Sequence, residues 1–194
     1  MENNLNAKSY IIIDITTTET ELKHLLSNFT IPCIRLATNN TDIEVNPKKI
    51  MKLLNICHEQ KTPLLLEDHY EISKDLGFDG VHIKKSNNDF EIILKMATED
   101  FMIGVDCGYS KHAGIVSAEL GASYISFKIP DDINPIDPDL LSWWHKTIEV
   151  PLVVEGCKSL NQFKQVKRIS DFVTISPTDW KSQDTFNKII KTLQ

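Results

Sequence analysis

The sequence predicts an α/β protein in which eight parallel strands close into a single-domain (β/α)8 barrel of the TIM type. Short apolar runs alternate along the chain with segments of helical periodicity. The alternation gives eight units of roughly 24 residues, and eight is the number that closes a barrel. No linker or low-complexity segment interrupts residues 1–194, so one domain is expected. The alternative is an open doubly wound sheet, but no G-x-G-x-x-G motif follows the first strand and the repeat is too even for an obvious switch point.

The expected strands are short and rich in Ile, Val and Leu, and most are continuously apolar rather than alternating. Continuous apolar runs are typical of strands that are covered by other elements on both faces. In chain order the expected strands are residues 10–17, 33–37, 63–68, 80–84, 102–107, 124–128, 151–156 and 172–177.

Amphipathic segments lie between these strands and are expected to form the outer helices. Pro47 suits the first turn of the second helix, and Ser159 is the expected N-cap of the seventh. The expected helices are residues 20–29, 47–60, 70–76, 89–96, 111–120, 138–146, 160–167 and 185–193.

Composition and charge exclude several classes of function. The net charge of -6 argues against nucleic-acid or membrane-surface binding, because phosphate groups favour clustered Lys and Arg. No apolar run approaches the ~20 residues that span a bilayer, and the first residues lack a secretory pattern. Cysteines at positions 33, 57, 107 and 157 match no C-x-x-C pattern, so reduced thiols in a cytoplasmic protein are expected.

The barrel itself predicts where the chemistry lies, because catalytic groups occupy the C-terminal ends of the strands and the loops that follow them. Several polar residues stand at these positions, where an unpaired buried charge would be costly, so a polar pocket is expected. They are Asp14, Thr16, Arg35, Glu67, Asp68, His69, His82, Lys84, Asp106, Cys107, Lys128, Glu155, Cys157, Ser176 and Thr178.

Two groups of these residues allow a structural and a functional interpretation. Asp14 and Arg35 lie on adjacent strands, so they could form an ion pair or contact a ligand. The Glu67-Asp68 pair could bind Mg²⁺ through its oxygens, or Asp68 could cap the following helix.

Other residues also have two interpretations. His82 could be a satisfied barrel-lining histidine or a catalytic one. Cys33, Cys107 and Cys157 fall near strand ends, but they belong to different strands and need not converge on a metal or thiol site. The Trp-Trp-His sequence at 143–145 could pack in the outer layer, with one Trp partly exposed, or form an oligomer contact.

Residues 63–83, PLLLEDHYEISKDLGFDGVHI, carry a family resemblance. This segment resembles the strand–helix–strand unit of thiamine phosphate synthases and their TenI relatives, in which Asn-Asp ends one strand and Gly-Ala-Asp-Gly-Val-His-Leu leads into the next. Further similar segments follow in the family's order at 103–105, 119–125 and 151–156, so that the resemblance runs from Cys33 to Ser176.

The resemblance implies an enzyme of thiamin biosynthesis that couples hydroxymethylpyrimidine diphosphate to thiazole phosphate and releases pyrophosphate. Mg²⁺ would neutralise the departing diphosphate, and turns that lead into helix N-termini would hold phosphate. The implied partners are small phosphorylated substrates and, through the outer helices, a second copy in a homodimer. The implied site consists of catalytic Arg35, Asp68 and His82, metal-binding Asp68 and Asn87, and substrate-binding Glu67, Asp106, Lys128, Gly156, Cys157 and Ser176.

The chain departs from the family pattern at several of these positions. Of the family's Gln-x-Arg-x-Lys on the second strand only Arg35 is present, and Asn-Asp is replaced by Glu67-Asp68. The second metal-binding Asp, which follows His-Leu-Gly-Gln in the family, falls at Asn87, within the sequence His-Ile-Lys-Lys-Ser-Asn.

Further departures lie on the later strands. The Ser and His after Gly-Val are replaced by Asp106 and Gly108, and Gly-Gly by Gly156-Cys157. The Pro-Thr-rich loop with its Lys is replaced by the acidic segment 129–136.

Three functional hypotheses follow. The chain is a thiamine phosphate synthase with an altered pocket, or a non-catalytic relative that binds a thiamine-related molecule or a protein. The third hypothesis is a barrel enzyme of another class, such as an isomerase or aldolase that uses His82, Asp106 or Lys128, the last as a Schiff-base lysine.

Overall fold

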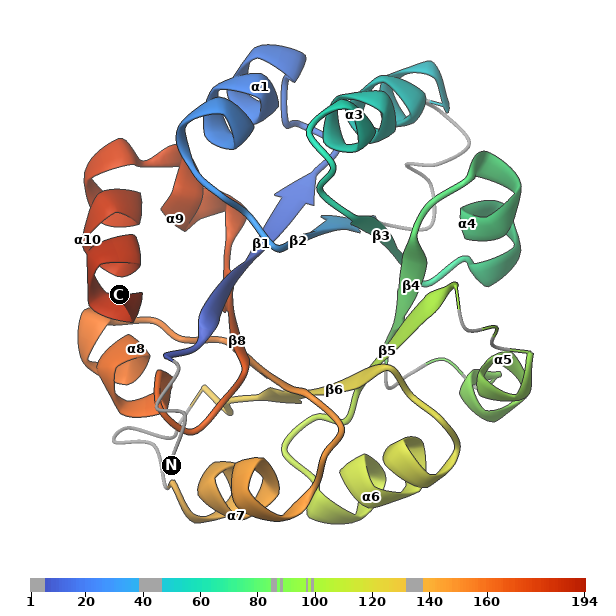
Figure 1. Ribbon diagram of the computed structural model, residues 1–194, viewed down its shortest axis with the longest axis vertical. Coiled ribbons are helices and arrows are strands. Elements are labelled where there is room, and N and C mark those ends of the chain that lie inside the picture. Colours follow the sequence, from blue (N-terminus) through green and yellow to red (C-terminus); the bar gives the residue numbers. More distant parts are fainter. Residues whose placement is uncertain are drawn as a thin grey trace.

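A computed structural model describes residues 6–38, 47–84, 87, 89–96, 98, 100–131 and 138–194. Eight parallel strands form a closed barrel in sequence order, with the last strand paired to the first (Figure 1). The barrel strands are β1 (Lys8–Asp14), β2 (Cys33–Ala37), β3 (Leu64–Glu67), β4 (Gly80–Ile83), β5 (Met102–Asp106), β6 (Tyr124–Lys128), β7 (Leu152–Glu155) and β8 (Phe172–Ile175). The predicted barrel is confirmed.

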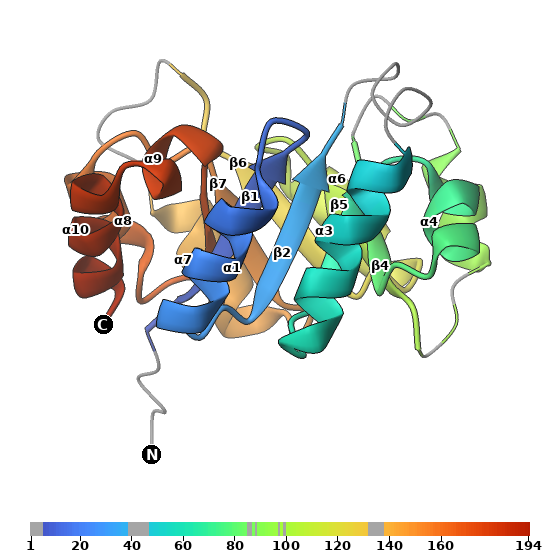
Figure 2. The same ribbon diagram turned by 90° about the horizontal axis from the view of Figure 1, so that it is seen from above.

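The helices surround the barrel (Figure 1), and the view turned by 90° shows helices α1 and α3 packed outside the strands (Figure 2). Side-chain caps begin several of them, and Ser159 caps α8 as predicted by accepting a hydrogen bond from the Gln162 backbone N–H. The helices are α1 (Glu19–Asn28), α3 (Pro47–Glu59), α4 (Tyr70–Leu76), α5 (Phe90–Lys95), α6 (Lys111–Glu119), α7 (Asp139–Thr147), α8 (Leu160–Val166), α9 (Pro177–Lys181) and α10 (Gln183–Leu193). No described helix is long and apolar enough to cross a membrane.

Boundary predictions were wrong for the first and the eighth strands. The strand predicted over 10–17 is β1, Lys8–Asp14, because Asp14 accepts the Thr16 and Thr17 backbone N–H groups in a turn. The apolar run predicted a strand over 172–177, but β8 ends at Ile175 and α9 begins at Pro177. Ser176 accepts a hydrogen bond from the Asp179 backbone N–H and so caps this helix, while Pro177 suits its first turn. A helix of five residues is too short to produce a periodic pattern.

The paired tryptophans pack in the outer layer, as one of the two interpretations predicted. Trp144 is fully buried, and its ring nitrogen donates to the Val150 carbonyl at 2.9 Å. Trp143 is partly exposed, and the Lys111 ammonium lies 3.4 Å from its ring centre.

A small apolar layer fills the inside of the barrel, separate from the larger core between strands and helices. Its buried members are Tyr10, Leu65, Tyr124 and Val153. The Tyr124 ring crosses the interior next to Gly104, where an added Cβ would lie 1.9 Å from a ring carbon. Gly104 is therefore required because the ring takes the space that any side chain would occupy.

The substitution Gly104→Ala tests this packing. We expect it to lower the free energy of unfolding by at least about 1–3 kcal/mol, the usual cost of overpacking a core. Gly77→Ala is the comparison, because no atom lies within 4 Å of an added Cβ there and the cost is confined to a φ of 81°. Denaturant unfolding of both variants measures the difference; an equal or smaller loss for Gly104→Ala would contradict the packing argument.

Candidate active site

A polar cavity of about 540 Å³ opens at the C-terminal end of the barrel. Six consecutive strands, β2 to β7, contribute to its lining. The lining residues are Arg35, Glu67, His82, Lys84, Asp106, Lys128 and Glu155. All seven belong to the set that the strand-end rule predicted.

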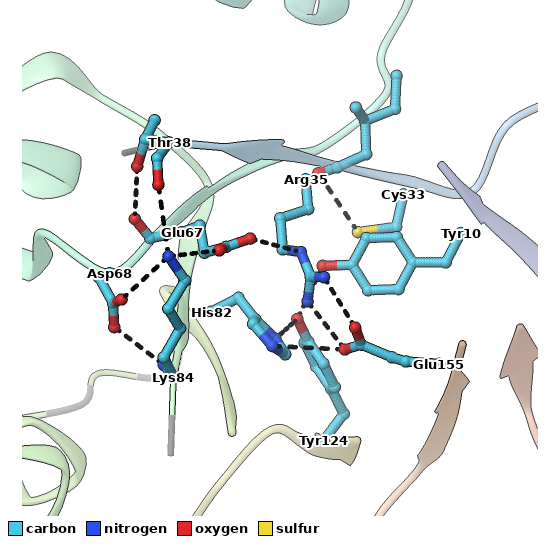
Figure 3. A network of polar contacts seen from close by, with 11 residues as sticks. Tyr10, Cys33, Arg35, Thr38, Glu67, Asp68, His82, Lys84, Tyr124 and Glu155 are labelled. Carbon is cyan, nitrogen blue, oxygen red and sulfur yellow. Dashed lines mark hydrogen bonds and ion pairs between the residues drawn. The ribbon is translucent and has the colours of Figure 1, made fainter. Parts of the chain in front are cut away.

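Arg35 lies at the centre of this cavity between two glutamates (Figure 3). Its Nη1 and Nη2 atoms donate to the two carboxylate oxygens of Glu155, each at 2.9 Å, and its Nε lies 3.3 Å from Glu67 Oε2. The side chains of all three are nearly buried, with 6% of Arg35 and 11% of each glutamate exposed. This two-point geometry is the strongest arrangement that a guanidinium and a carboxylate form.

Of the two interpretations of Asp14 and Arg35, the ion pair was wrong. Ile12, not Asp14, is opposite Arg35 in the β1–β2 register, so Asp14 lies two residues farther along the strand. There the Asp14 carboxylate accepts the Thr16 and Thr17 backbone N–H groups and pairs with Lys181 at 3.4 Å. The turn after β1 therefore satisfies Asp14 locally.

Burial and the central arginine set the charges of the neighbouring groups. Burial lowers the pKa of His82 to about 3, and the positive charge of Arg35 adds to this effect. Burial opposes ionisation of Glu155, but Arg35 and His82 outweigh it and lower the pKa of Glu155 to about 2. At neutral pH a neutral imidazole thus faces an ionised Glu155, with His82 Nε2 3.5 Å from Glu155 Oε1.

Two tyrosines extend the contacts of His82 into the barrel. His82 Nδ1 lies 2.9 Å from the Tyr124 hydroxyl, which is 2.8 Å from the Tyr10 hydroxyl. All three side chains are buried. His82 is therefore a satisfied barrel-lining histidine that also borders the cavity. Looking for polar residues at the ends of strands could not find Tyr10 and Tyr124, because both lie deep in the barrel. The sequence signal for them would have been a polar aromatic residue on the inward face of a strand.

The Lys84 ammonium occupies a cage of oxygen atoms beside this centre. Its Nζ lies 2.8 Å from Glu67 Oε1, 3.3 Å from the Thr38 carbonyl oxygen and 3.8 Å from Asp68 Oδ2. Thr38 in turn donates its hydroxyl to the Glu67 carbonyl. The oxygens come from the ends of β2 and β3, and the ammonium comes from the residue after β4.

Asp68 does not cap the next helix, so that interpretation was wrong. The N-cap residue of α4 is His69, which makes no side-chain cap hydrogen bond. Asp68 Oδ1 instead accepts the Lys84 backbone N–H at 2.9 Å and the Asn87 side-chain amide at 3.3 Å. Asp68 and His69 both have a φ of 54°, in the left-handed region that most residues avoid, and such strain clusters at functional sites.

The remaining predicted residues divide into two groups. Asp106 and Lys128 line the cavity; burial raises the pKa of Asp106, whose Oδ1 accepts the Gly108 backbone N–H at 2.7 Å. Gly156, Cys157 and Ser176 do not line it. Burial raises the pKa of the Cys157 thiol to about 12, and the Ser176 hydroxyl donates to Asp179.

The acidic segment predicted after the sixth strand is described in part. Asp131 pairs with Lys158 at 2.6 Å, and residues 132–136 lie outside the described part of the chain. Within the described residues no three His, Cys, Asp or Glu side chains are arranged to hold a metal ion.

Comparison with known proteins identifies the family of this barrel. The family model described as thiamine monophosphate synthase matches residues 10–174. The chain belongs to this family. Similar curated relatives are the thiamine-phosphate synthases of Rhodospirillum centenum, 25% identical over 132 residues, and of Nitrosospira multiformis, 27% identical over 157 residues. The matches cover 65% and 76% of this chain and 64% and 66% of the relatives, just under two thirds of their length.

Solved structures show the same barrel. Thiamine phosphate pyrophosphorylase from Pyrococcus furiosus has a TM-score of 0.78 at 16% identity and covers 96% of this chain and 97% of its own. The YdjI aldolase of Escherichia coli has a TM-score of 0.67 at 11% identity, covering 97% of this chain and 87% of its own. At these identities the structural comparison shows the fold alone.

Internal ion pairs hold the charged residues of this thiamine monophosphate synthase family member. Arg35, for which the sequence resemblance implies a substrate contact, is already held by Glu155 and Glu67. The family's His-Leu-Gly-Gln becomes His-Ile-Lys-Lys, so that Lys84 stands where the family has Gly. Both features follow from the side chains of this chain and not from the fold.

Removal of Glu155 tests the central ion pair. Glu155→Ala leaves Arg35 buried with one carboxylate fewer, and we expect a loss of about 3–5 kcal/mol in unfolding free energy. The double variant Arg35→Met, Glu155→Leu removes both charges and should recover most of that loss. Denaturant unfolding of the single and double variants gives the coupling; a double variant no more stable than Glu155→Ala would contradict the pairing.

The lowered pKa values predict loss of stability in acid. The folded pKa of His82 is about 3 and its unfolded value is ~6.5, so the unfolded chain alone takes up that proton between these values. Stability that is fully present above pH ~6.5 should fall by up to about 1.4 kcal/mol per pH unit as the pH is lowered towards 3. Glu155 adds a further loss below pH ~4.5, down to its folded pKa of about 2.

Unfolding of His82→Gln across this range isolates the histidine contribution. Between about pH 6 and 4.5, the free energy of unfolding of this variant should depend less steeply on pH than that of the parent chain. The difference in slope should correspond to the uptake of nearly one proton on unfolding. Equal slopes for the two proteins would show that His82 takes up its proton in the folded state as easily as in the unfolded chain.

Proposed function

We propose that this chain catalyses the thiamine phosphate synthase reaction, joining hydroxymethylpyrimidine diphosphate to thiazole phosphate with release of pyrophosphate. The observation that carries the proposal is the family match over residues 10–174, on a barrel whose charged residues gather in one cavity at the C-terminal ends of six strands. In this reaction a carbon–oxygen bond to the diphosphate breaks and a carbon–nitrogen bond to the thiazole forms. Negative charge therefore develops on the departing pyrophosphate and must be neutralised.

Lys128 is the proposed contact for a substrate phosphate. It is exposed at the cavity, and among the described residues no carboxylate lies within 4.0 Å of its ammonium. Gly156, Cys157 and Ser176, which follow β7 and β8, are proposed to contribute at the rim. Gly156 has a φ of 86° in the turn before α8, and turns of this kind present backbone N–H groups to anions.

The other cavity residues are proposed to orient the pyrimidine. The Asp106 carboxylate can accept a hydrogen bond from an amino group of the ring, while Glu67, Glu155 and neutral His82, held by their internal contacts, form the adjoining cavity wall. Arg35 acts as a positioning residue, because it fixes both glutamates. We propose that the reaction takes place in the cytoplasm, and the homodimer stays a prediction that sedimentation can check.

The test is a coupled assay of the purified protein with both substrates, measuring thiamine phosphate and pyrophosphate, with and without Mg²⁺. We expect both products in equal amounts. Lys128→Ala should lower the rate at least about tenfold through the lost phosphate contact. Lys146→Ala, an equal loss of charge on the exposed face of α7, should leave the rate unchanged.

A non-catalytic ligand-binding role is the second candidate. The observation that favours it is the two-point pairing of Arg35 with Glu155, which occupies the arginine face that a diphosphate would need. Absence of product from folded protein, together with a rise in melting temperature on adding thiamine phosphate, would establish this role and exclude the synthase.

A further inference from the structure

Mg²⁺, which the family resemblance implies, does not fit the residues expected to hold it. Asn87 directs its side-chain nitrogen at Asp68, and its oxygen accepts the Asp89 backbone N–H at 2.9 Å. Asp68 Oδ1 already accepts two N–H groups. The carboxylate oxygens of Glu67 are also engaged, one by Arg35 and the other by Lys84.

The space between these oxygens is occupied by the Lys84 ammonium. Carboxylate and carbonyl oxygens are the ligands that hard divalent cations prefer, and here Glu67, Asp68 and the Thr38 carbonyl all face Nζ. The ammonium donates to Glu67 Oε1 and the Thr38 carbonyl, and its compact positive charge also pairs with Asp68 Oδ2 at 3.8 Å. Mg²⁺ at the same place would meet this like charge within a few ångströms.

We propose that Lys84 takes the place of a divalent metal ion and makes the site independent of Mg²⁺. The ammonium neutralises the Glu67–Asp68 carboxylate pair and supplies positive charge at the cavity wall, where 39% of its side chain is exposed. This step rests on the proposed function, in which the positive charge of Lys84 is available to the departing pyrophosphate. Lys84 thus accounts for two differences from the family pattern at once. One is the lysine at the position where the family has Gly, and the other is Asn87 at the position where the family has its second metal-binding Asp.

Binding of Mn²⁺, followed by electron paramagnetic resonance, tests the proposal without any substrate. The parent protein should show no Asp68-dependent binding of Mn²⁺ at millimolar concentration. Lys84→Ala should bind Mn²⁺ at least about tenfold more tightly, because the cage then keeps its oxygens and loses the competing charge. Adding Asp68→Asn to Lys84→Ala should abolish the gain, and Lys146→Ala should bind Mn²⁺ as the parent does.

If circular dichroism shows that Lys84→Ala does not fold, Lys84→Met replaces it in the Mn²⁺ experiment, because methionine keeps most of the side-chain volume. Asp68-dependent Mn²⁺ binding by the parent protein, or a folded lysine variant that gains none, would overturn the proposal. Loss of turnover on chelation with EDTA would overturn it too. A gain in Mn²⁺ binding by the lysine variants without any thiamine phosphate formation by the parent would refute the proposed function and leave the replacement of the metal standing.

Discussion

The buried guanidinium of Arg35 is the constraint on which the arrangement of residues at the C-terminal end of the barrel depends. Taking a charge out of water costs several kcal/mol unless oxygens of opposite charge replace the solvent. Arg35 on β2 meets this requirement with Glu155, which is 120 residues away in sequence on β7, and with Glu67 on the neighbouring β3. The same charge lowers the pKa of Glu155 and keeps it ionised, while burial, assisted by Arg35, lowers the pKa of His82 and keeps it neutral. Burial and one ion pair together set the charge state of these groups.

The consequences spread outward through shared atoms. Glu67 uses one oxygen for Arg35 and the other for Lys84, so the central pair and the lysine cage are parts of one network (Figure 3). Asp68 is held in a strained turn by N–H groups from the segment after β4. Positive charge in the cavity is therefore largely satisfied from within the chain, and Lys128 is the lining cation that has no carboxylate within 4.0 Å among the described residues. Membership of a synthase family and an internally paired site coexist because the barrel does not depend on the identity of its mouth residues.

Much of the fold could be predicted because its signals are local. The β2 and β6 runs matched the structure at both ends, and α4 did too, since apolar periodicity and turn residues act over a few positions. The short α9 was missed because five residues show no period, and its Ser176 cap was read as part of a strand. Looking at strand ends found every described residue that lines the cavity. It missed Tyr124, which contacts His82 deep inside the barrel, and Tyr10, which contacts Tyr124.

By itself the sequence determined the barrel, the family and the set of polar residues that its strand ends bring to one mouth. Tertiary structure decided which of them pair. Asp14 and Arg35 appeared as partners on adjacent strands, but the register places them at different levels, and the true partner of Arg35 lies across the barrel on β7. Asp68 and Asn87 were expected as metal ligands, but the Lys84 ammonium lies 3.8 Å from Asp68 Oδ2 and Asn87 turns its side-chain nitrogen towards Asp68 Oδ1. Pairing depends on distances of a few ångströms between segments far apart in the chain, and closure of the barrel sets those distances.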